Sequence, residues 1–374
     1  MRTEPLYVAN PLLPEFDDFV SSVKEIWDSR VVTNHGPYHN QLERQLEDVF
    51  LVDTVKLYNN GTNGLLAALK IFDFPIGSEV ITTPFTFAAT THSITWNGLV
   101  PVFADIEGDR FTIDPECVEA AITDKTVAIL AVHVYGNPCK IEQLEIIAKK
   151  HNLKLIFDGA HSFDTKYNGR GIASYGDLTV FSFHATKLFN TIEGGAIATS
   201  DTSLSNRLYI QRNFGIKNEN EVIDIGINGK MNEIQALVGC LNLKKFQDEK
   251  RKRQILREIY NDIFTVAGVS FQSPEDNWTL SEQYYPLNIE ESICGFSRDE
   301  LYEALKKENI ISRKYFHPAC NDFEPYKDKI IITNGYEVVV DKIKKQMLCM
   351  PFHSGVTDDD ISVIREVVSK LARS

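Results

Sequence analysis

Short apolar runs alternate, along the first half of the chain, with longer stretches in which apolar residues recur at helical spacing. The short runs are rich in Val, Ile, Leu and Phe and show little alternation with polar residues, which is typical of parallel strands covered on both faces. They predict strands at 79–82, 99–104, 126–134, 153–157 and 177–183. The alternation of strand and helix patterns predicts an α/β fold with a mostly parallel sheet.

The helical stretches begin at recognisable turn or capping signals. They predict helices at 62–72 (after NNGTNG), 86–96 (after a turn at Pro84), 114–122 and 141–151. Asp114 and Pro115 open the third of these, because an Asp side chain caps free N–H groups and proline fits the first turn of a helix. The last three helices lie between predicted strands, as the crossover connections of a parallel sheet require.

The charge pattern changes near residue 245. The segment 244–260, KKFQDEKRKRQILREIY, is strongly charged and amphipathic, and it predicts a long helix that faces solvent. We expect it to connect a large domain with an N-terminal arm, residues 1–245, to a smaller α+β domain, residues 246–374. The elements predicted in the second domain are strands near 283–288 and 346–351 and helices near 298–308, 336–346 and 357–372.

Composition and charge narrow the class of protein. A chain of 374 residues with 43% hydrophobic residues can bury the cores of a large domain and a smaller one. Its formal net charge of −13 argues against nucleic acid and membrane surfaces as partners. The N-terminal stretch lacks the pattern of a signal peptide, and no 18-residue apolar run occurs. The six cysteines form no CxxC pair, as in reduced proteins. We therefore expect a cytoplasmic protein.

Two chemically useful residues follow predicted strands. Asp158 ends the strand in LKLIFDGAHS, and Lys187 lies just beyond the strand LTVFSF, in HATKLFNTIEGG. Ligands bind at the carboxyl ends of strands in open α/β sheets, so this carboxylate and this amine can face one ligand. A lysine in a partly dry site can form a Schiff base, and a carboxylate can keep a pyridinium nitrogen protonated. This pair is the minimum that pyridoxal phosphate chemistry requires.

The segment NNGTNG adds a place for the phosphate of such a cofactor. It lies between the strand-like VKLYN and the helix at 62–72. The backbone N–H groups of Thr62 and Asn63 would therefore lie at a helix N-terminus, where they can cradle an anion. A glycine-rich turn or a strand-final Asp is by itself only a structural feature, so the hypothesis rests on the three features together.

Other sequence patterns give no support for a different chemistry. GRG at 169–171 follows the hairpin-like DTKYN and opens no helix, so it predicts a turn and not a dinucleotide site. The nine histidines show no HExxH pattern or clustering, and no metal is expected. The sequence also lacks a GxSxG motif, which leaves serine hydrolysis without support.

A colinear set of segments spans nearly the whole chain. Its members are GTNGLLAAL at 61–69, TPFTFAATTHSI at 83–94, FADI at 103–106, HVYGNP at 133–138, FDGAHS at 157–162, SFHATK at 182–187, EGGAI at 193–197, RNFGI at 212–216, GINGKMNEIQA at 226–236 and MPFHSGVTDDDI at 350–361. In this order they resemble the DegT/DnrJ/EryC1/StrS family of sugar aminotransferases. The resemblance implies a pyridoxal phosphate enzyme with the aspartate aminotransferase-like fold, fold type I.

The resemblance also implies a role for each matching residue. Lys187 would carry the cofactor, which alternates with pyridoxamine phosphate, and would move a proton between substrate and cofactor. Asp158 would pair with the pyridine nitrogen, Phe87 would lie against the ring face, and His161 would reach the region of the ring hydroxyl. The residues that would hold the cofactor phosphate are Thr62, Asn63, Ser182 and, from the neighbouring subunit, Asn228. The contribution from a neighbour implies an obligate homodimer with shared active sites.

The chain departs from many relatives at three positions. His161, Lys230 and Phe214 stand where those relatives have Gln, Arg and His. His161 keeps a hydrogen-bonding group, whereas Lys230 lacks the guanidinium fork of a bidentate phosphate contact. Lys187 favours transamination, because relatives that have become dehydratases carry His at this position.

The substrate is predicted from a finer resemblance. FHATKLFNTIEGGA resembles the subgroup that aminates C4 of the nucleotide-linked keto sugar dTDP-4-keto-6-deoxyglucose, with L-glutamate as donor, to give dTDP-4-amino-4,6-dideoxyglucose. Two alternatives stay open: a C3-keto nucleotide sugar or inosose as substrate, and a non-catalytic regulatory protein on this scaffold. The candidates for a contact with the sugar diphosphate are Lys230, Arg212, Arg313 and Lys314, and His184 is a candidate to pack near the cofactor.

Overall fold

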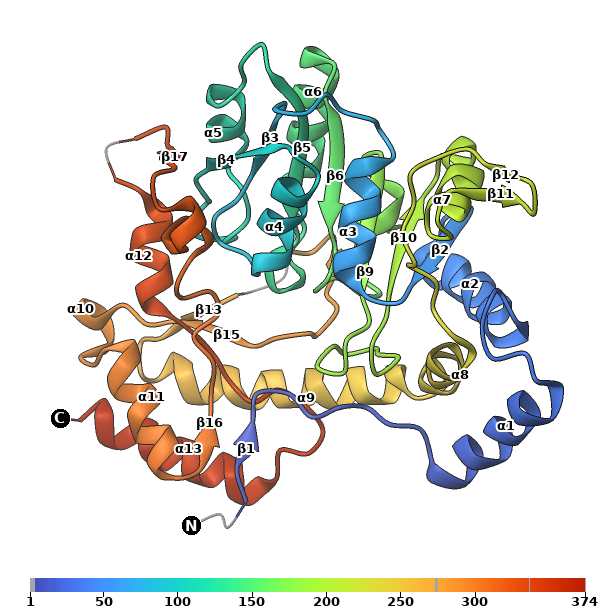
Figure 1. Ribbon diagram of the computed structural model, residues 1–374. Helices are drawn as coiled ribbons and strands as arrows, with labels where there is room; N and C mark the ends of the chain where they lie inside the picture. Colours follow the sequence, from blue (N-terminus) through green and yellow to red (C-terminus); the bar gives the residue numbers. More distant parts are fainter. Residues whose placement is uncertain (1–3, 273–274, 336, 374) are drawn as a thin grey trace.

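A computed structural model describes residues 4–272, 275–335 and 337–373, and its centre is an eight-stranded sheet of order β17-β4-β3-β5-β6-β9-β10-β2 (Figure 1). The strands are β2 (Thr54–Tyr58), β3 (Glu79–Thr82), β4 (Val100–Ala104), β5 (Thr126–Val132), β6 (Lys154–Asp158), β9 (Leu178–Ser182), β10 (Gly195–Thr199) and β17 (Ile331–Ile332). Neighbouring strands are parallel except at β10, which runs antiparallel to both β9 and β2. The five predicted strands and the mostly parallel sheet are confirmed.

Helices cover both faces of this sheet (Figure 1). One face packs against α3 (Gly61–Lys70), α4 (Ala88–Trp96) and α7 (Ser205–Gln211), and the other against α2 (Pro37–Phe50), α5 (Pro115–Ala120), α6 (Ile141–His151) and α8 (Glu233–Asn242). Successive strand residues alternate between the two faces of the sheet. Ile156 therefore packs on the face covered by α3, and Phe157 packs on the face covered by α2. The four predicted helices are confirmed, with α4 starting two residues late because Phe87 is still extended.

The N-terminal part reaches across the molecule. Strand β1 (Leu6–Tyr7) pairs in parallel with β16 (Ile310–Ile311), so the N-terminal segment lies beside C-terminal elements in Figure 1. Helix α1 (Phe16–Ser29) then packs on α8 through Ile26. None of these elements was predicted. The two-residue strands carry no periodic signal, whereas the helical spacing of apolar residues in α1 was overlooked.

The C-terminal part forms a second core. The antiparallel strands β13 (Ser270–Phe271), β15 (Pro286–Asn288) and β18 (Met347–Cys349) lie with α9 (Phe246–Thr265), α10 (Glu291–Cys294), α11 (Arg298–Lys307) and α13 (Asp358–Leu371). Helix α12 (Val339–Gln346) instead buries its apolar residues in a cluster that includes Val132 of the large sheet. The predicted elements are present, although residue 336, the predicted start of α12, lies outside the described residues. The expectation that α9 faces solvent is wrong for one side of the helix. Its Glu249, Arg253 and Arg257 are buried because they form ion pairs inside the protein.

Segments after residue 245 also complete the first part of the chain. Strand β17 extends the large sheet at β4, and β14 (Trp278–Thr279) pairs with β7 (Lys166–Tyr167). The hairpin of β7 and β8 (Arg170–Gly171) turns at two residues with positive φ, Asn168 and Gly169, as a two-residue hairpin loop requires. The predicted turn is therefore present at Gly169, whereas the other two residues of GRG form β8. The domain boundary at 245 stays a prediction.

A few general features complete the fold. Strands β11 (Ile216–Asn218) and β12 (Glu221–Val222) form an exposed hairpin. All six cysteines are buried and free. Across the described ranges, no helix is long and apolar enough to span a bilayer, and no three His, Cys, Asp or Glu residues gather in a way that could hold a metal ion.

Candidate active site

A cavity of about 390 Å³ lies at the carboxyl ends of the central strands. Strands β5, β6 and β9 each contribute their last residue to its wall, namely Val132, Asp158 and Ser182. The wall also includes Thr62, Phe87, His161, His184, Thr186, Lys187, Glu193, Tyr284, Arg313, Tyr315 and Phe316. The cavity therefore collects, at the edge that the strand-end rule predicts, all the predicted site residues except Asn63 and Asn228.

Lys187 supplies the amine of this cavity. It lies on the loop after β9, is half-buried, and its Nζ lies 5.8 Å from the centroid of the Tyr284 ring. Burial lowers the pKa of Lys187 to about 8, although the charge of Asp158 acts in the opposite direction. A substantial fraction of the amine is therefore neutral near pH 8, and the neutral amine is the nucleophilic and proton-accepting form.

Asp158 presents a buried and oriented carboxylate. Its Oδ2 accepts a hydrogen bond from the Thr90 hydroxyl at 2.8 Å, and its Oδ1 accepts one from the N–H of Ala160 at 3.0 Å. Burial raises the pKa of Asp158, and these two hydrogen bonds together with the charge of Lys187 oppose the rise. The contacts fix the carboxylate while each oxygen keeps a second lone pair for a ligand N–H group.

The N-terminus of α3 forms an anion cradle beside Ser182. The side chain of Asn60 caps the helix by accepting the N–H of Asn63 at 2.8 Å, so the first two N–H groups, of Gly61 and Thr62, are left for a ligand. A Cβ atom on Gly61 would lie only 3.0 Å from the Cβ of Ser182, so the helix start and the end of β9 approach closely. This geometry suits a phosphate group.

His161 forms a buried part of the cavity wall. Its ring is buried, stacks on Phe316 with centroids 5.9 Å apart, and accepts the N–H of Tyr135 on Nδ1 at 3.2 Å. Burial, and then the charge of Lys187, hold the pKa of His161 well below its usual value. The ring is therefore neutral, and the hydrogen-bond pattern assigns its proton to Nε2, which makes it a donor.

Phe87 offers an aromatic face to the cavity. It is the residue before α4, it lines the cavity, and 63% of its surface is exposed. A large apolar ring that remains this exposed in a pocket is free to stack on a planar ligand.

Asn63 and Asn228 do not belong to the cavity wall as the described residues form it. The Asn63 amide donates to the side-chain oxygen of Asn59 at 2.7 Å, and the Asn59 amide donates to the carbonyl of Asn228 at 3.2 Å. Both asparagines thus brace the loop before α3, and Asn228 remains exposed. Their predicted contacts with the phosphate stay predictions.

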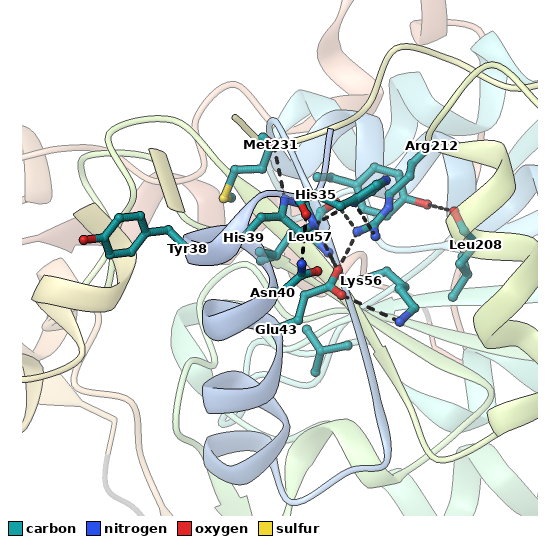
Figure 2. Close-up of polar contacts among 12 residues, drawn as sticks. His35, Tyr38, His39, Asn40, Glu43, Lys56, Leu57, Leu208, Arg212 and Met231 are labelled. Atoms are coloured by element: carbon teal, nitrogen blue, oxygen red, sulfur yellow. Dashed lines mark hydrogen bonds and ion pairs between the residues drawn. The ribbon is translucent and has the colours of Figure 1, made fainter. Parts of the chain in front are cut away.

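Arg212 is buried in an ion pair and has no access to a ligand. Figure 2 shows its guanidinium between Glu43 and His35, with 1% of the residue exposed. Burial alone would raise the pKa of Glu43, but the hydrogen bond with His39 and the charge of Arg212 hold it far below the usual range. The prediction that Arg212 contacts a sugar diphosphate is therefore wrong, because its charge is neutralised inside the protein.

The other three basic candidates differ in their surroundings. Lys230 donates to Asn213 at 2.6 Å, and Lys314 pairs with Asp299 at 2.6 Å. Arg313 is exposed and lines the cavity. Of the four candidates, Arg313 is thus the cation that the described structure places in the site.

Several residues in and behind the cavity wall were missed by the sequence analysis. Thr90, which holds Asp158 from behind the wall, lies four residues after Thr86, and their hydroxyls are 2.8 Å apart, so helical spacing in TFAATTHSI could have indicated it. Tyr284 and Tyr315 line the wall from segments about 100 to 130 residues downstream of Lys187, and no local signal marks them. His184, which was a candidate, does line the cavity and lies 3.6 Å from Glu193.

These residues fit pyridoxal phosphate. The anion cradle, the exposed ring of Phe87, the carboxylate of Asp158 and the amine of Lys187 match in turn a phosphate, an aromatic ring, a pyridine nitrogen and an aldehyde. The donors and acceptors come from four different segments of the chain that meet in one cavity. Among the described residues, the cavity wall contains no second buried carboxylate that would oppose this fit.

Known proteins share this architecture. The chain is 37% identical to a dTDP-4-amino-4,6-dideoxy-D-glucose transaminase of Shigella dysenteriae, over 97% of this chain and 99% of that protein, and 36% identical to one of Escherichia coli, over 98% and 99%. The crystal structure of DesI in the presence of its TDP-sugar product superposes with a TM-score of 0.93 at 32% identity, over 99% of this chain and 94% of that one. The expected fold is thereby confirmed. The family model described as the DegT/DnrJ/EryC1/StrS aminotransferase family matches residues 15–370, and the chain belongs to this family.

Proposed function

We propose that this sugar aminotransferase moves the amino group of L-glutamate to the C4 ketone of dTDP-4-keto-6-deoxyglucose, giving dTDP-4-amino-4,6-dideoxyglucose. The observation that carries the proposal is the meeting of the Lys187 amine and the Asp158 carboxylate beside an anion cradle in one cavity. The names of the Shigella and Escherichia relatives support the choice of sugar and of C4.

The proposed mechanism assigns the proton transfers to Lys187. Pyridoxal phosphate, when bound, supplies an aromatic ring that stabilises negative charge on a neighbouring carbon. In the first half-reaction, neutral Lys187 would take the proton from the α-carbon of glutamate, whose amino group would pass to the cofactor while water supplies the keto oxygen of the released 2-oxoglutarate. In the second half-reaction, protonated Lys187 returns a proton to C4 of the keto sugar. Its pKa of about 8 suits both directions at neutral pH.

The other residues of the site are proposed to hold and orient the cofactor. The negative charge of Asp158 would keep a proton on the pyridine nitrogen, and a protonated ring withdraws electrons more strongly than a neutral one. Phe87 lies against the ring face, and His161 donates from Nε2 toward the ring hydroxyl. Thr62 and Ser182 hold the phosphate at the start of α3.

The decisive assay combines the purified protein with pyridoxal phosphate, L-glutamate and dTDP-4-keto-6-deoxyglucose. We expect catalytic release of 2-oxoglutarate and a C4-amino sugar identified by mass and NMR. Release of a single equivalent of 2-oxoglutarate without an aminated sugar would indicate that the true substrate is a C3-keto nucleotide sugar or an inosose. A protein that binds no cofactor and releases no 2-oxoglutarate would favour the regulatory alternative.

Arg313 is expected to bind the anionic part of a substrate. Replacing it with methionine keeps much of the side-chain volume but removes the charge, and it should raise the KM of one substrate by about 10-fold, because a charge-assisted hydrogen bond contributes on the order of 1.5–3 kcal/mol. Steady-state kinetics with each substrate varied in turn identifies which one. The neighbouring Lys314→Met, which removes a charge already paired with Asp299, is the control and should leave both KM values unchanged.

The active form is proposed to be a homodimer with shared sites. Exposed apolar residues occur in the segments that follow α1, Lys187 and α7, including the β11–β12 hairpin. They are Val31, Val32, Ile192, Phe214, Val222, Ile223 and Ile225. Exposed large apolar side chains of this kind are frequent in protein interfaces. The exposed Asn228 belongs to the same region and would reach the partner's cofactor phosphate.

Subunit mixing tests the shared site. Lys187→Ala and Asn228→Ala subunits, each impaired alone at limiting cofactor, should regain about a quarter of wild-type activity after joint refolding, because half of randomly paired dimers are mixed and each holds one intact site. Sites built within single subunits would give no recovery beyond the sum of the two variants.

Cofactor loading is expected to depend on pH through Lys187. Only the neutral amine reacts, and with a pKa of about 8 its neutral fraction rises from about 10% at pH 7 to about 90% at pH 9. The rate at which apoprotein gains absorbance above about 400 nm should therefore rise through pH 8 and then level off. Nα-acetyl-lysine, whose ε-amine is free, is titrated with the same cofactor as the control. A rate that keeps rising beyond pH 10 would contradict the lowered pKa.

The six free, buried cysteines are typical of a reducing compartment. We therefore propose that the reaction takes place in the cytoplasm.

A further inference from the structure

One glutamine side chain holds both neighbours of Lys187. The Oε1 of Gln283 accepts the N–H of Leu188 at 2.6 Å, and its Nε2 donates to the carbonyl of Thr186 at 3.1 Å. Gln283 is itself 4% exposed, so both hydrogen bonds are shielded from water. The two peptide groups that flank Lys187 are thereby fixed from outside their own loop.

The same short segment also holds His161. The Ser281 hydroxyl donates to the carbonyl of His161 at 2.6 Å and accepts the N–H of Gln283 at 3.2 Å. We name residues 281–283 the clamp segment. It connects two residues of the cavity wall, Lys187 and His161, that come from different loops of the large sheet.

Buried charges of α9 anchor the clamp segment. Arg253 donates to the carbonyl of Glu282 at 3.1 Å and is held by Glu249 at 2.8 Å, while Arg257 pairs with the Glu282 carboxylate at 2.6 Å. Glu282 has a φ of 58°, in the left-handed region that favours glycine, so this backbone shape needs outside support. The two arginines provide that support from a helix of the C-terminal core.

We propose that Gln283 is a positioning residue that fixes the backbone of Lys187, and that the clamp segment aligns Lys187 with His161 from helix α9. A lysine side chain has four rotatable bonds, so the direction of its amine depends strongly on how firmly its backbone is held. The loop around Lys187 contains no helix or strand that would hold it otherwise. This inference rests on the proposed role of Lys187.

The test compares Gln283→Leu with Gln272→Leu, which removes the amide of a glutamine that is similarly buried, 5% exposed, and lies outside the cavity wall. Amide hydrogen exchange of residues 184–190, followed by mass spectrometry in the holoenzyme, should become about 10-fold faster in Gln283→Leu only. Its kcat should fall by about 10- to 100-fold with both KM values within about twofold of wild type, because misplacement of Lys187 affects chemistry and not binding.

A second variant keeps the proposal testable if Gln283→Leu does not fold. Gln283→Glu retains the acceptor for Leu188 and loses the donor to Thr186, so it should keep the Leu188 amide protected and lose only part of kcat. Exchange and kcat equal to those of Gln272→Leu in whichever variants fold would overturn the proposal. Exchange does not require turnover, so a protected loop in a wild-type protein without the expected transamination would refute the proposed function and not the clamp.

Discussion

Lys187→Ala is expected to lower kcat/KM by at least about 1,000-fold and to abolish absorbance above about 400 nm. A positioned general acid or base contributes roughly 10²–10⁴-fold, and this substitution also removes the amine that attaches the cofactor. The described cavity wall contains no second lysine that could replace this amine. His184 lines the same cavity, but it is engaged with Thr186 at 2.9 Å and lies beside Glu193.

The measurement pairs the absorption spectrum of the purified variant with single-turnover release of 2-oxoglutarate. Lys125→Ala is the control, because Lys125 is exposed and lies outside the cavity wall. It should leave both the spectrum and kcat/KM unchanged. A Lys187→Ala protein that stays coloured and retains more than about 1% of wild-type turnover would place the chemistry on another residue.

The parts of this fold that the sequence predicts are those with a local pattern. Buried strands such as β5 and β6 are continuous apolar runs, because helices cover both of their faces. β10 looks much the same in sequence, but its direction follows from the path of the loop after Lys187 and is not encoded in its own residues. The pairings of β1 with β16 and of β17 with β4 join segments more than 200 residues apart, and no local signal can predict them.

The residues of the candidate site likewise fall into those with a local sequence signal and those without one. Asp158, Lys187 and the start of α3 were predicted because strand ends and helix starts have physical signatures. Tyr284 and Tyr315 arrive at the cavity from the C-terminal part, and Gln283 reaches the loop of Lys187 from the same part, through three-dimensional packing alone. Arg212 was misjudged for the converse reason, because a charged residue shows its buried partner only in the structure.

Asp158→Asn is expected to lower kcat by about 100- to 1,000-fold while leaving the fold intact, a range typical for the loss of one preorganised electrostatic contact. The amide has nearly the shape of the carboxylate, and its oxygen can still accept the N–H of Ala160. It carries no charge with which to keep the pyridine nitrogen protonated. Because burial raises the pKa of Asp158, the charge is costly to the folded state, and its removal should leave the melting temperature unchanged or higher.

Asp105→Asn is the matched control for this variant. Asp105 also follows directly on a strand of the large sheet, is 1% exposed, and accepts the backbone N–H groups of Val339 and Val340 at the start of α12. Burial raises its pKa as well, but it lies outside the cavity wall. We expect Asp105→Asn to change the melting temperature and not kcat, and Asp158→Asn to lower kcat without lowering the melting temperature. Equal effects of the two substitutions on kcat would mean that Asp158 supports the strand end and not the chemistry.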